Sequence, residues 1–364
     1  MPRRRAFDRW LFLTAVLFVV GGVFMVGSAS HYIAMSQGKA PTYFLVRQIL
    51  FLCLGGLLMA GAMKLPLAWL NDRRVVYGLV ATSIVLLLGV LAAPSSQGAH
   101  RWFRIGPFGV QPSELAKITT VILLAHVLAR RTAEQVNDLR QTLVPLVGTI
   151  GLLAMLIVIE PDLGSAVILL ATAATLLFVS GLRWRYIGAT AAAGAIFVVG
   201  AIIAQPYRLQ RIKTFLNPGA DTQGAGFQLA QSLLAVGSGG LWGVGLGQGQ
   251  QKAYYLPAAH TDFIFSVIGE ELGLVGTLLV LAGVALLAWR GFRAALNAPD
   301  GFELHVALGA TCLIVLQSLV HMGVCVGLLP TKGLSFPLLS YGGSSLVASL
   351  VVVGLLLNVS QHSN

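Results

Sequence analysis

Charged side chains at the ends of long apolar segments are the residues of this sequence that could do chemistry. A carboxylate or an ammonium group is costly near the core of a bilayer, so each is a functional candidate by default. Four clusters of this kind occur, around Lys117, Asp162, Asp262 and Lys332. Together they predict a polar cavity whose basic groups bind an anion.

The first cluster joins Arg101 and Arg104 to a predicted helix start at Pro112. Glu114 and Lys117 are three residues apart, so they share one helix face, and an ion pair would reduce the cost of burying either group. One interpretation is a helix cap with a structural ion pair. The other is a cavity wall in which Lys117 and the two arginines bind an anion.

The second cluster, Glu160-Pro161-Asp162, joins two apolar runs with almost no loop. Acidic residues at a helix N-terminus are stabilised by the macrodipole, so capping is the simplest role for Asp162. The alternative role is a cavity residue.

The third cluster lies at the start of an apolar run, where Thr261 is a plausible N-cap and Asp262 then opens the helix. Glu270 and Glu271 follow inside the run, and the sequence offers no partner for Glu271. Small residues share the face of Asp262 and suit close helix packing: Ser266, Gly269, Gly273 and Gly276. A simple first-turn acid is the alternative role for Asp262.

The fourth cluster, residues 330–345, contains two prolines and three glycines and cannot form a regular helix. Lys332 lies within it. Ser344 or Ser345 could cap the following apolar run, and free amides at that helix start could bind an anion such as a phosphate.

The elements that position these clusters follow from composition. The chain has 364 residues, of which 56% are hydrophobic and only 10% charged, with a mean hydropathy of +0.82. Average soluble proteins carry about 25% charged residues, so soluble and disordered classes are excluded in favour of a membrane protein. Three cysteines without CxxC spacing predict no disulfide framework or zinc site, only small buried hydrophobes.

A spanning helix needs about 20 apolar residues. The sequence therefore predicts one all-α polytopic membrane domain over residues 1–364 with ten spans. The spans lie near residues 11–28, 45–63, 76–93, 114–129, 143–159, 164–181, 187–204, 263–289, 305–329 and 344–359. The long connection 205–261 carries several aromatics, which predicts an ordered, partly membrane-embedded element.

The net charge of +11 is scattered over short loops rather than gathered in a stripe, which argues against nucleic acid as a partner. A cytoplasmic N-terminus places 14 of the 24 basic residues in the N-terminal tail or short cytoplasmic loops. Ten spans then return the C-terminus to the cytoplasm, and all four clusters lie towards the outer face.

Short segments spread along the chain, in their order, resemble the SEDS family (shape, elongation, division and sporulation), and its FtsW branch more than its RodA branch. The Pro330-Thr331-Lys332-Gly333 variant is similar to the FtsW branch. The matching segments are Met25–Ser30, Arg101-Trp102, Gln111–Lys117, Glu160–Gly164, Gly226–Gln228, Gln231-Ser232, His260–Phe265, Glu270–Gly273, Leu329–Gly333 and Ser340–Ser345.

The resemblance implies a ten-span SEDS-type fold and a peptidoglycan glycosyltransferase of the inner membrane. Such an enzyme polymerises lipid II at the outer face, here for septal synthesis in cell division. Its implied partners are a class B penicillin-binding protein transpeptidase and other divisome membrane proteins. By match to the family's essential acidic residue, Asp262 is required for polymerisation.

Lipid II carries an α-linked glycosyl diphosphate and the polymer is β-1,4 linked, so one inverting displacement with a single base suffices. We expect Asp262 to be that base or else the ligand of a divalent cation, Mg²⁺ or Mn²⁺; no organic cofactor is implied. We expect the leaving diphosphate to be bound by basic residues on the outer side of the membrane. We expect Glu114, Asp162 and Ser344 to be further cavity residues. The basic residues are Arg101, Arg104, Lys117 and Lys332.

Two other classes of function fit a polytopic membrane protein. A lipid II flippase would place its site near the bilayer midplane between internal repeats, whereas these charges gather towards one face. A scaffold would not need Asp262, Glu114 and Lys117 near hydrocarbon. Within the family, a RodA-type enzyme of cell elongation is the alternative.

Overall fold

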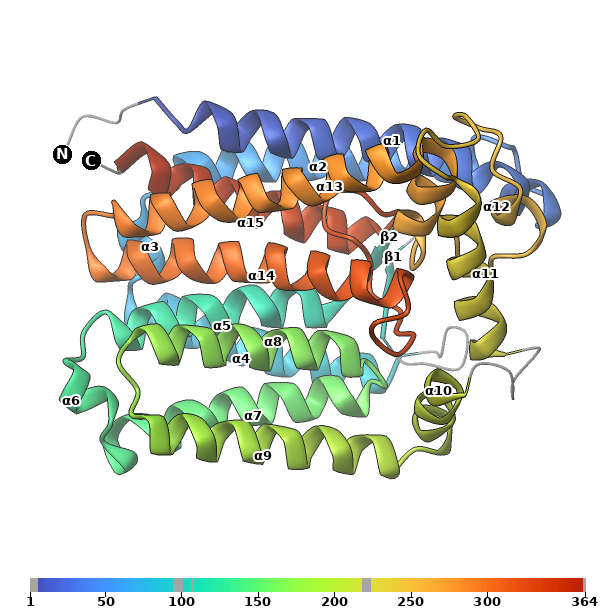
Figure 1. Cartoon of the computed structure of the whole chain (residues 1–364). Coiled ribbons are helices and arrows are strands. Elements are labelled where there is room, and N and C mark those ends of the chain that lie inside the picture. Colours follow the sequence, from blue (N-terminus) through green and yellow to red (C-terminus); the bar gives the residue numbers. More distant parts are fainter. Residues whose placement is uncertain (1–5, 94–100, 106–107, 218–223, 363–364) are drawn as a thin grey trace.

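The computed structural model describes residues 6–93, 101–105, 108–217 and 224–362. Its long helices form one bundle, with short elements at both ends (Figure 1). The elements are α1 (Arg9–Ser36), α2 (Tyr43–Lys64), α3 (Leu67–Leu70), α4 (Arg73–Leu91), β1 (Phe103–Ile105), β2 (Phe108–Val110), α5 (Pro112–Leu128), α6 (Ala133–Val136), η1 (Leu139–Leu143), α7 (Val144–Ile159), α8 (Leu163–Val179), α9 (Trp184–Ile203), α10 (Pro206–Leu216), α11 (Ala225–Ser238), α12 (Gln251–Tyr254), α13 (Ile264–Leu296), α14 (Gly301–Cys325) and α15 (Gly343–His362).

The chain is a multi-pass integral membrane protein, and each of the ten predicted spans coincides with a helix. In the described part of the chain, eight helical segments are long and apolar enough to cross a bilayer, while α5 and α8 are shorter, at 17 residues each. All backbone groups of a helix are satisfied within the segment, which is why an apolar run of this length folds as a helix in lipid.

The core of the bundle lies around α14, which packs against α5, α8, α13 and α15. In α14 and α15, 78% of the most apolar stretch is buried, whereas α9 has no buried residue. Helix α9 therefore lies at the periphery and contributes little to the core.

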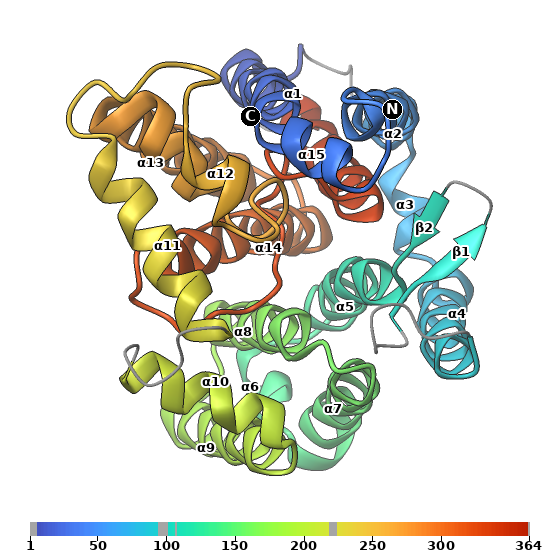
Figure 2. The same cartoon turned by 90° about the vertical axis from the view of Figure 1, so that its right-hand side faces the viewer.

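The two ends of the bundle differ. The start of α1, the end of α15 and the short helices α3 and α6 lie at one end, and the hairpin and α10 to α12 lie at the other (Figure 1). Viewed along the bundle, α10, α11 and α12 cover the ends of the long helices (Figure 2). Residues 205–261, predicted to be ordered, supply all three of these helices.

The all-α fold class is confirmed, and a two-stranded antiparallel hairpin, β1–β2, in which Arg104 pairs with Gly109, is added to it. Two expectations for single residues are wrong. Cys53 is exposed rather than buried, although all three cysteines are free. Ser344 lies within the first turn of α15, which already begins at Gly343, so it does not cap that helix from outside.

The start of the eighth long helix also differs from the prediction. Helix α13 begins at Ile264 and Phe263 is its N-cap, so neither Thr261 nor Asp262 caps or opens it. The turn that carries Asp262 instead closes on Ala258, whose carbonyl accepts from the backbone N–H groups of Thr261 and Asp262. The predicted small-residue face is interrupted as well, because Gly273 has a non-helical backbone.

Candidate functional site

A cavity of about 260 Å³ lies at the end of the bundle that carries α10. It is lined by Arg101, Pro161, Asp162, Leu163, Gly164, Val198, Ile202, Tyr207, Arg208, Arg211, Ile212, Pro330, Thr331, Lys332 and Gly333. Four of these side chains are basic and only Asp162 is acidic. Because α9 contributes two apolar residues, the cavity has both a cationic and an apolar wall.

The three arginines of the cavity are held by backbone carbonyls. Arg101 Nε donates to the carbonyl of Glu160 at 3.0 Å, and Arg208 donates to Val158 and Ala201 at 2.8 and 2.9 Å.

Arg211 donates to the carbonyl of Thr331 at 2.9 Å, which ties α10 to the segment that carries Lys332. The carbonyls bonded by Arg101 and Arg208 lie at or next to the C-terminal ends of α7 and α9, where the helix dipole favours positive charge. Among the described residues, none of these guanidinium groups forms an ion pair with a carboxylate, so their charge remains available to an anion.

Lys332 has no hydrogen bond or ion pair among the residues that the structure describes. Burial lowers the pKa of its ammonium group, and the charge of Asp162 opposes that shift. The side chain is half-buried. A partly desolvated ammonium group without a partner is costly, so its presence beside three arginines points to an anionic ligand.

Asp262 lies at the edge of this cavity, beside Gly333. A Cβ atom added to Gly333 would lie 3.2 Å from Oδ2 of Asp262, so a side chain there would crowd the carboxylate. Removal from water raises the pKa of the Asp262 carboxyl to about 6, while the positive charges of Arg211 and Arg101 oppose the shift. A carboxylate with a pKa near 6 is suited to accept a proton at neutral pH.

The turn that carries Asp262 is fixed by the segment before α15. Ser340 Oγ donates to the carbonyl of Thr261 at 2.6 Å, and the N–H of Tyr341 donates to the carbonyl of His260 at 2.9 Å. These bonds hold the carboxylate and the Lys332 segment in one arrangement.

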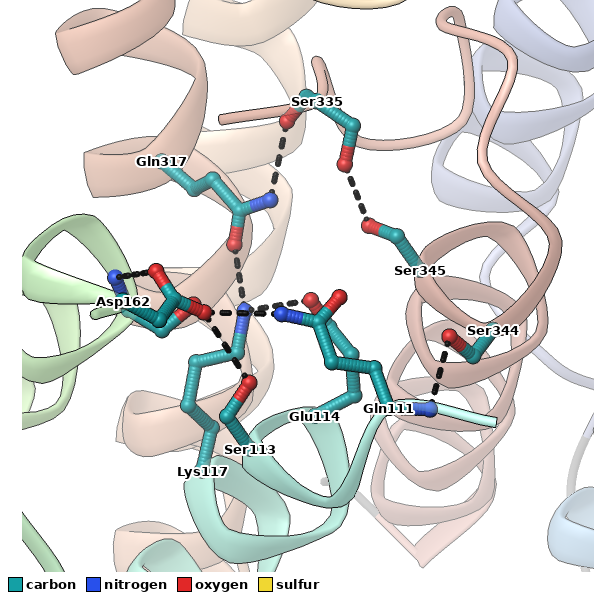
Figure 3. Close-up of polar contacts among 10 residues, drawn as sticks. Gln111, Ser113, Glu114, Lys117, Asp162, Gln317, Ser335, Ser344 and Ser345 are labelled. Atoms are coloured by element: carbon teal, nitrogen blue, oxygen red, sulfur yellow. Dashed lines mark hydrogen bonds and ion pairs between the residues drawn. The ribbon is translucent and has the colours of Figure 1, made fainter. Parts of the chain in front are cut away.

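Asp162 connects the cavity to a buried polar network (Figure 3). Its Oδ1 accepts from the N–H of Ser165, which confirms the predicted cap of α8. Its Oδ2 accepts from Gln111 Nε2 at 2.7 Å and from Ser113 Oγ at 3.2 Å.

The predicted ion pair of Glu114 and Lys117 is confirmed, at 3.0 Å (Figure 3). Lys117 also donates to Gln317 Oε1 at 2.8 Å, and Gln317 in turn donates to the carbonyl of Ser335. Both charged side chains are buried and line a separate small space of about 20 Å³. Every charge in this network has a partner of opposite sign or a hydrogen bond.

Glu160 is fully buried, and neither of its carboxylate oxygens has a hydrogen-bond partner in the described part of the chain. Desolvation and the neighbouring Asp162 raise its pKa to about 9, against the effect of Arg101. The side chain is therefore protonated and neutral at pH 7, and its backbone carbonyl serves to hold Arg101.

Of the predicted site residues, the structure places Arg101, Asp162 and Lys332 in the cavity and Asp262 at its edge. The other four lie elsewhere. Arg104 is exposed on β1, Glu114 and Lys117 form the closed network, and Ser344 Oγ accepts from the N–H of Gln111 at 3.2 Å.

Two cavity residues were not predicted, Arg208 and Arg211. They are three residues apart on α10 and so lie on one face of the helix. This spacing is visible in the sequence and could have identified them as a basic pair. The sequence alone does not show that this face closes a cavity formed by four other segments.

The side chains that line the cavity do not suit a divalent cation. Within the described ranges no group of three or more His, Cys, Asp or Glu residues could hold a metal ion. The cavity offers one carboxylate among four basic side chains, whereas Mg²⁺ and Ca²⁺ prefer several oxygen ligands. The role of Asp262 as a metal ligand stays a prediction, and the basic residues supply the positive charge here.

Comparison with known proteins gives matches over nearly the full chain. The family model FTSW_RODA_SPOVE, described as a cell cycle protein, matches residues 8–364. Stage V sporulation protein E of Bacillus subtilis is 38% identical over 357 residues, covering 98% of this chain and 97% of that protein. A probable peptidoglycan glycosyltransferase FtsW of Nitrosococcus halophilus is 43% identical, covering 97% and 92%.

Solved structures share the fold. A chain from a study of how a peptidoglycan synthase complex coordinates polymerization and crosslinking superposes with a TM-score of 0.79 at 33% identity, covering 98% of each chain. The rod shape determining protein RodA of Thermus thermophilus superposes with a TM-score of 0.72 at 30% identity, covering 98% of this chain and 97% of that one.

Proposed function

Because the chain belongs to the FtsW/RodA/SpoVE family, the SEDS family, we propose that it is a peptidoglycan glycosyltransferase that polymerises lipid II into β-1,4-linked glycan. The observation that carries the proposal is the position of Asp262 at the edge of a cavity with four basic side chains and one acidic one. A base beside an anion site is the arrangement that transfer from a glycosyl diphosphate requires.

The reaction is one inverting displacement. The acceptor hydroxyl oxygen attacks the anomeric carbon of the donor, and the bond from that carbon to the diphosphate oxygen breaks with its electron pair. The hydroxyl proton passes to Asp262, whose raised pKa of about 6 leaves it ionised before the step and able to hold a proton after it.

The cavity supplies the electrostatic part of the reaction. Negative charge grows on the leaving diphosphate, and Arg101, Arg208, Arg211 and Lys332 stabilise it. The arginines are already fixed by carbonyl groups, so they need no rearrangement as the charge develops. The apolar wall from α9 suits the first isoprene units of a lipid carrier.

For orientation, we propose that the cavity end faces outwards and that both termini lie in the cytoplasm. The short connections at the terminal end of the bundle, including α3 and α6, carry the basic residues counted by the positive-inside rule (Figure 1). Catalysis on the outer face fits a product that is built outside the cell.

Within the family, we propose a role in septal synthesis with a class B penicillin-binding protein and other divisome membrane proteins. The support is the Pro330–Gly333 variant and identities of 37–43% to several relatives named FtsW. The similar chain from a peptidoglycan synthase complex supports a transpeptidase partner.

The test uses purified protein in vesicles with lipid II, with and without the partner transpeptidase. Formation of glycan polymer by the wild-type protein supports the proposal. Movement of lipid II across the vesicle membrane without polymer would support the flippase instead. Depletion in cells separates the roles, since loss of septa indicates division and loss of rod shape indicates elongation.

A further inference from the structure

Helix α13 is broken one third of the way along its length. Gly273 has a φ of 65°, which ends the regular helix after residues 264–272. We call this first part the front section of α13; it follows Asp262 by two residues. Because a helical section moves as a unit, whatever fixes the front section also fixes one end of the turn that carries Asp262.

A loop segment, residues 239–252, is inserted into the break. In an unbroken helix the N–H groups of Leu274 and Val275 would donate to the carbonyls of Glu270 and Glu271. Here those carbonyls accept from Val244 and Gly245 at 3.0 and 3.1 Å.

The freed N–H groups donate to the same segment, from Leu274 to Gly240 at 2.9 Å and from Val275 to Leu241 at 3.2 Å. The approach is so close that a Cβ on Gly243 would lie 2.1 Å from the Glu271 carbonyl oxygen. The inserted segment thus replaces the missing part of the helix ladder.

The side chains of the front section bind the same segment. Glu270 Oε1 accepts from the N–H groups of Gln250 and Gln251 at 2.7 and 3.1 Å. Glu271 Oε2 accepts from the N–H of Gly247 at 3.0 Å, and its other oxygen forms an ion pair with Lys252.

Ser28 of α1 completes this cluster. Its hydroxyl donates to Glu271 at 2.8 Å and lies 2.5 Å from Lys252 Nζ. Lys252 is the largest fully buried side chain in the described residues, and Glu271 is 0% exposed. The cluster therefore joins α1, the inserted segment and α13 at a single buried point.

We propose that Lys252 and Glu271, with Ser28, are positioning residues for Asp262, acting through the front section of α13. The inference rests on the proposed function. Replacing a buried ion pair by apolar groups is often neutral or stabilising, so stability alone does not explain this one. The break gives a reason for it, since a front section that is separated from the rest of α13 at Gly273 needs a second attachment to keep the carboxylate in place.

The test is the double variant Lys252→Met/Glu271→Gln, which leaves no unpaired buried charge. The matched control is Asp8→Asn/Arg290→Met, which removes the ion pair between the N-cap of α1 and the opposite end of α13. Polymerisation of lipid II is measured as kcat and KM with the full chain and its transpeptidase in vesicles, together with the Tm of each variant.

We expect kcat of the Lys252/Glu271 variant to fall about 10- to 100-fold, because small misplacements of a catalytic group are costly. KM should change less than about threefold, since none of the cavity residues is touched, and the control should keep the wild-type kcat. A merely structural role would lower Tm and leave kcat per folded molecule unchanged.

A wild-type kcat in the folded double variant overturns the inference. If the double variant does not stay monodisperse, Ser28→Ala removes only the hydroxyl, and a wild-type kcat there overturns it instead. An inactive wild-type protein in the same assay would count against the proposed function, whereas an active wild type with unaffected variants counts against the positioning role alone.

Discussion

Two charged regions lie close together, since Ser113, which donates to Asp162 of the cavity, precedes Glu114 of the network in the chain. Their charges are balanced in different ways. In the network of Glu114, Lys117 and Gln317, every charge is matched and the enclosed space is about 20 Å³. In the cavity of about 260 Å³, four basic side chains have one carboxylate among them and Lys332 has no partner in the described residues.

The difference separates structural charge from functional charge. A matched buried pair can only lose stability when one partner is removed, because nothing else in the structure compensates the other. An unmatched excess of charge costs stability in the free protein and is compensated when a ligand of opposite charge binds. Substitutions in the first region should therefore affect unfolding, and substitutions in the second should affect turnover.

The largest effect is expected from Asp262→Asn, which removes the base. Polymerisation should fall by at least about 10³-fold, near the upper range for general base catalysis. The Tm should stay the same or rise, because the replaced carboxyl is held away from water in the folded state. Asp300→Asn, at the N-cap of α14, is the matched control with wild-type activity. A clear loss of stability in Asp262→Asn would remove the contrast between the two regions.

In the matched network, Lys117→Met should lower the free energy of unfolding by about 3–5 kcal/mol, because Glu114 is left buried without its ammonium partner. Denaturation of the purified protein measures the loss. The double variant Lys117→Met/Glu114→Gln should recover most of it. Equal loss in the single and double variants would argue that the pair is not the stabilising element.

In the cavity, Lys332→Gln should lower kcat/KM for lipid II by about 10- to 100-fold, the value of one hydrogen bond to a charged group. The Tm should not fall, since the ammonium group has no partner to lose. Steady-state kinetics with a parallel thermal melt separates the two quantities. Unchanged kinetics with a lower Tm would assign Lys332 to the structural class.

The pH dependence of polymerisation should reflect the base. With a pKa of about 6, Asp262 is ionised above that pH, so the rate should fall about tenfold per unit below pH 6 and level off above it. Initial rates between pH 5 and 8 measure the profile, provided that the protein stays folded over the range. A rate that is flat down to pH 5 would contradict the assignment.

The smallest effect is expected from Glu160→Gln. The folded-state pKa of Glu160 is raised from 4.5 to about 9, so the native state holds its proton more tightly than the unfolded state. Stability should therefore decline as pH rises from about 5 towards 9, and the Gln variant should lose this decline while keeping wild-type activity near pH 7. A large loss of activity in the variant would mean that the ionised form is used.

The sequence predicts the parts of this structure that depend on local rules. Apolar runs of bilayer length give the helices, and the spacing of Glu114 and Lys117 gives their ion pair. It does not predict the partner of Glu271, because Lys252 lies on a segment whose fold is fixed only by contact with α13. Glycine at position 273 predicted close packing of a continuous helix. Glycine suits a helix break equally well, so the residue type alone does not distinguish the two, and the structure has the break.

The way in which the three arginines are anchored also bears on the speed of the enzyme. Their positions are fixed by backbone carbonyls, and so their charge is as strong after bond cleavage as before it. A site of this kind retains its spent carrier, a lipid diphosphate, as firmly as it stabilises the departing group. Escape of that carrier then limits turnover, so the first sugar transfer should be faster than the following ones and added polyprenyl diphosphate should inhibit.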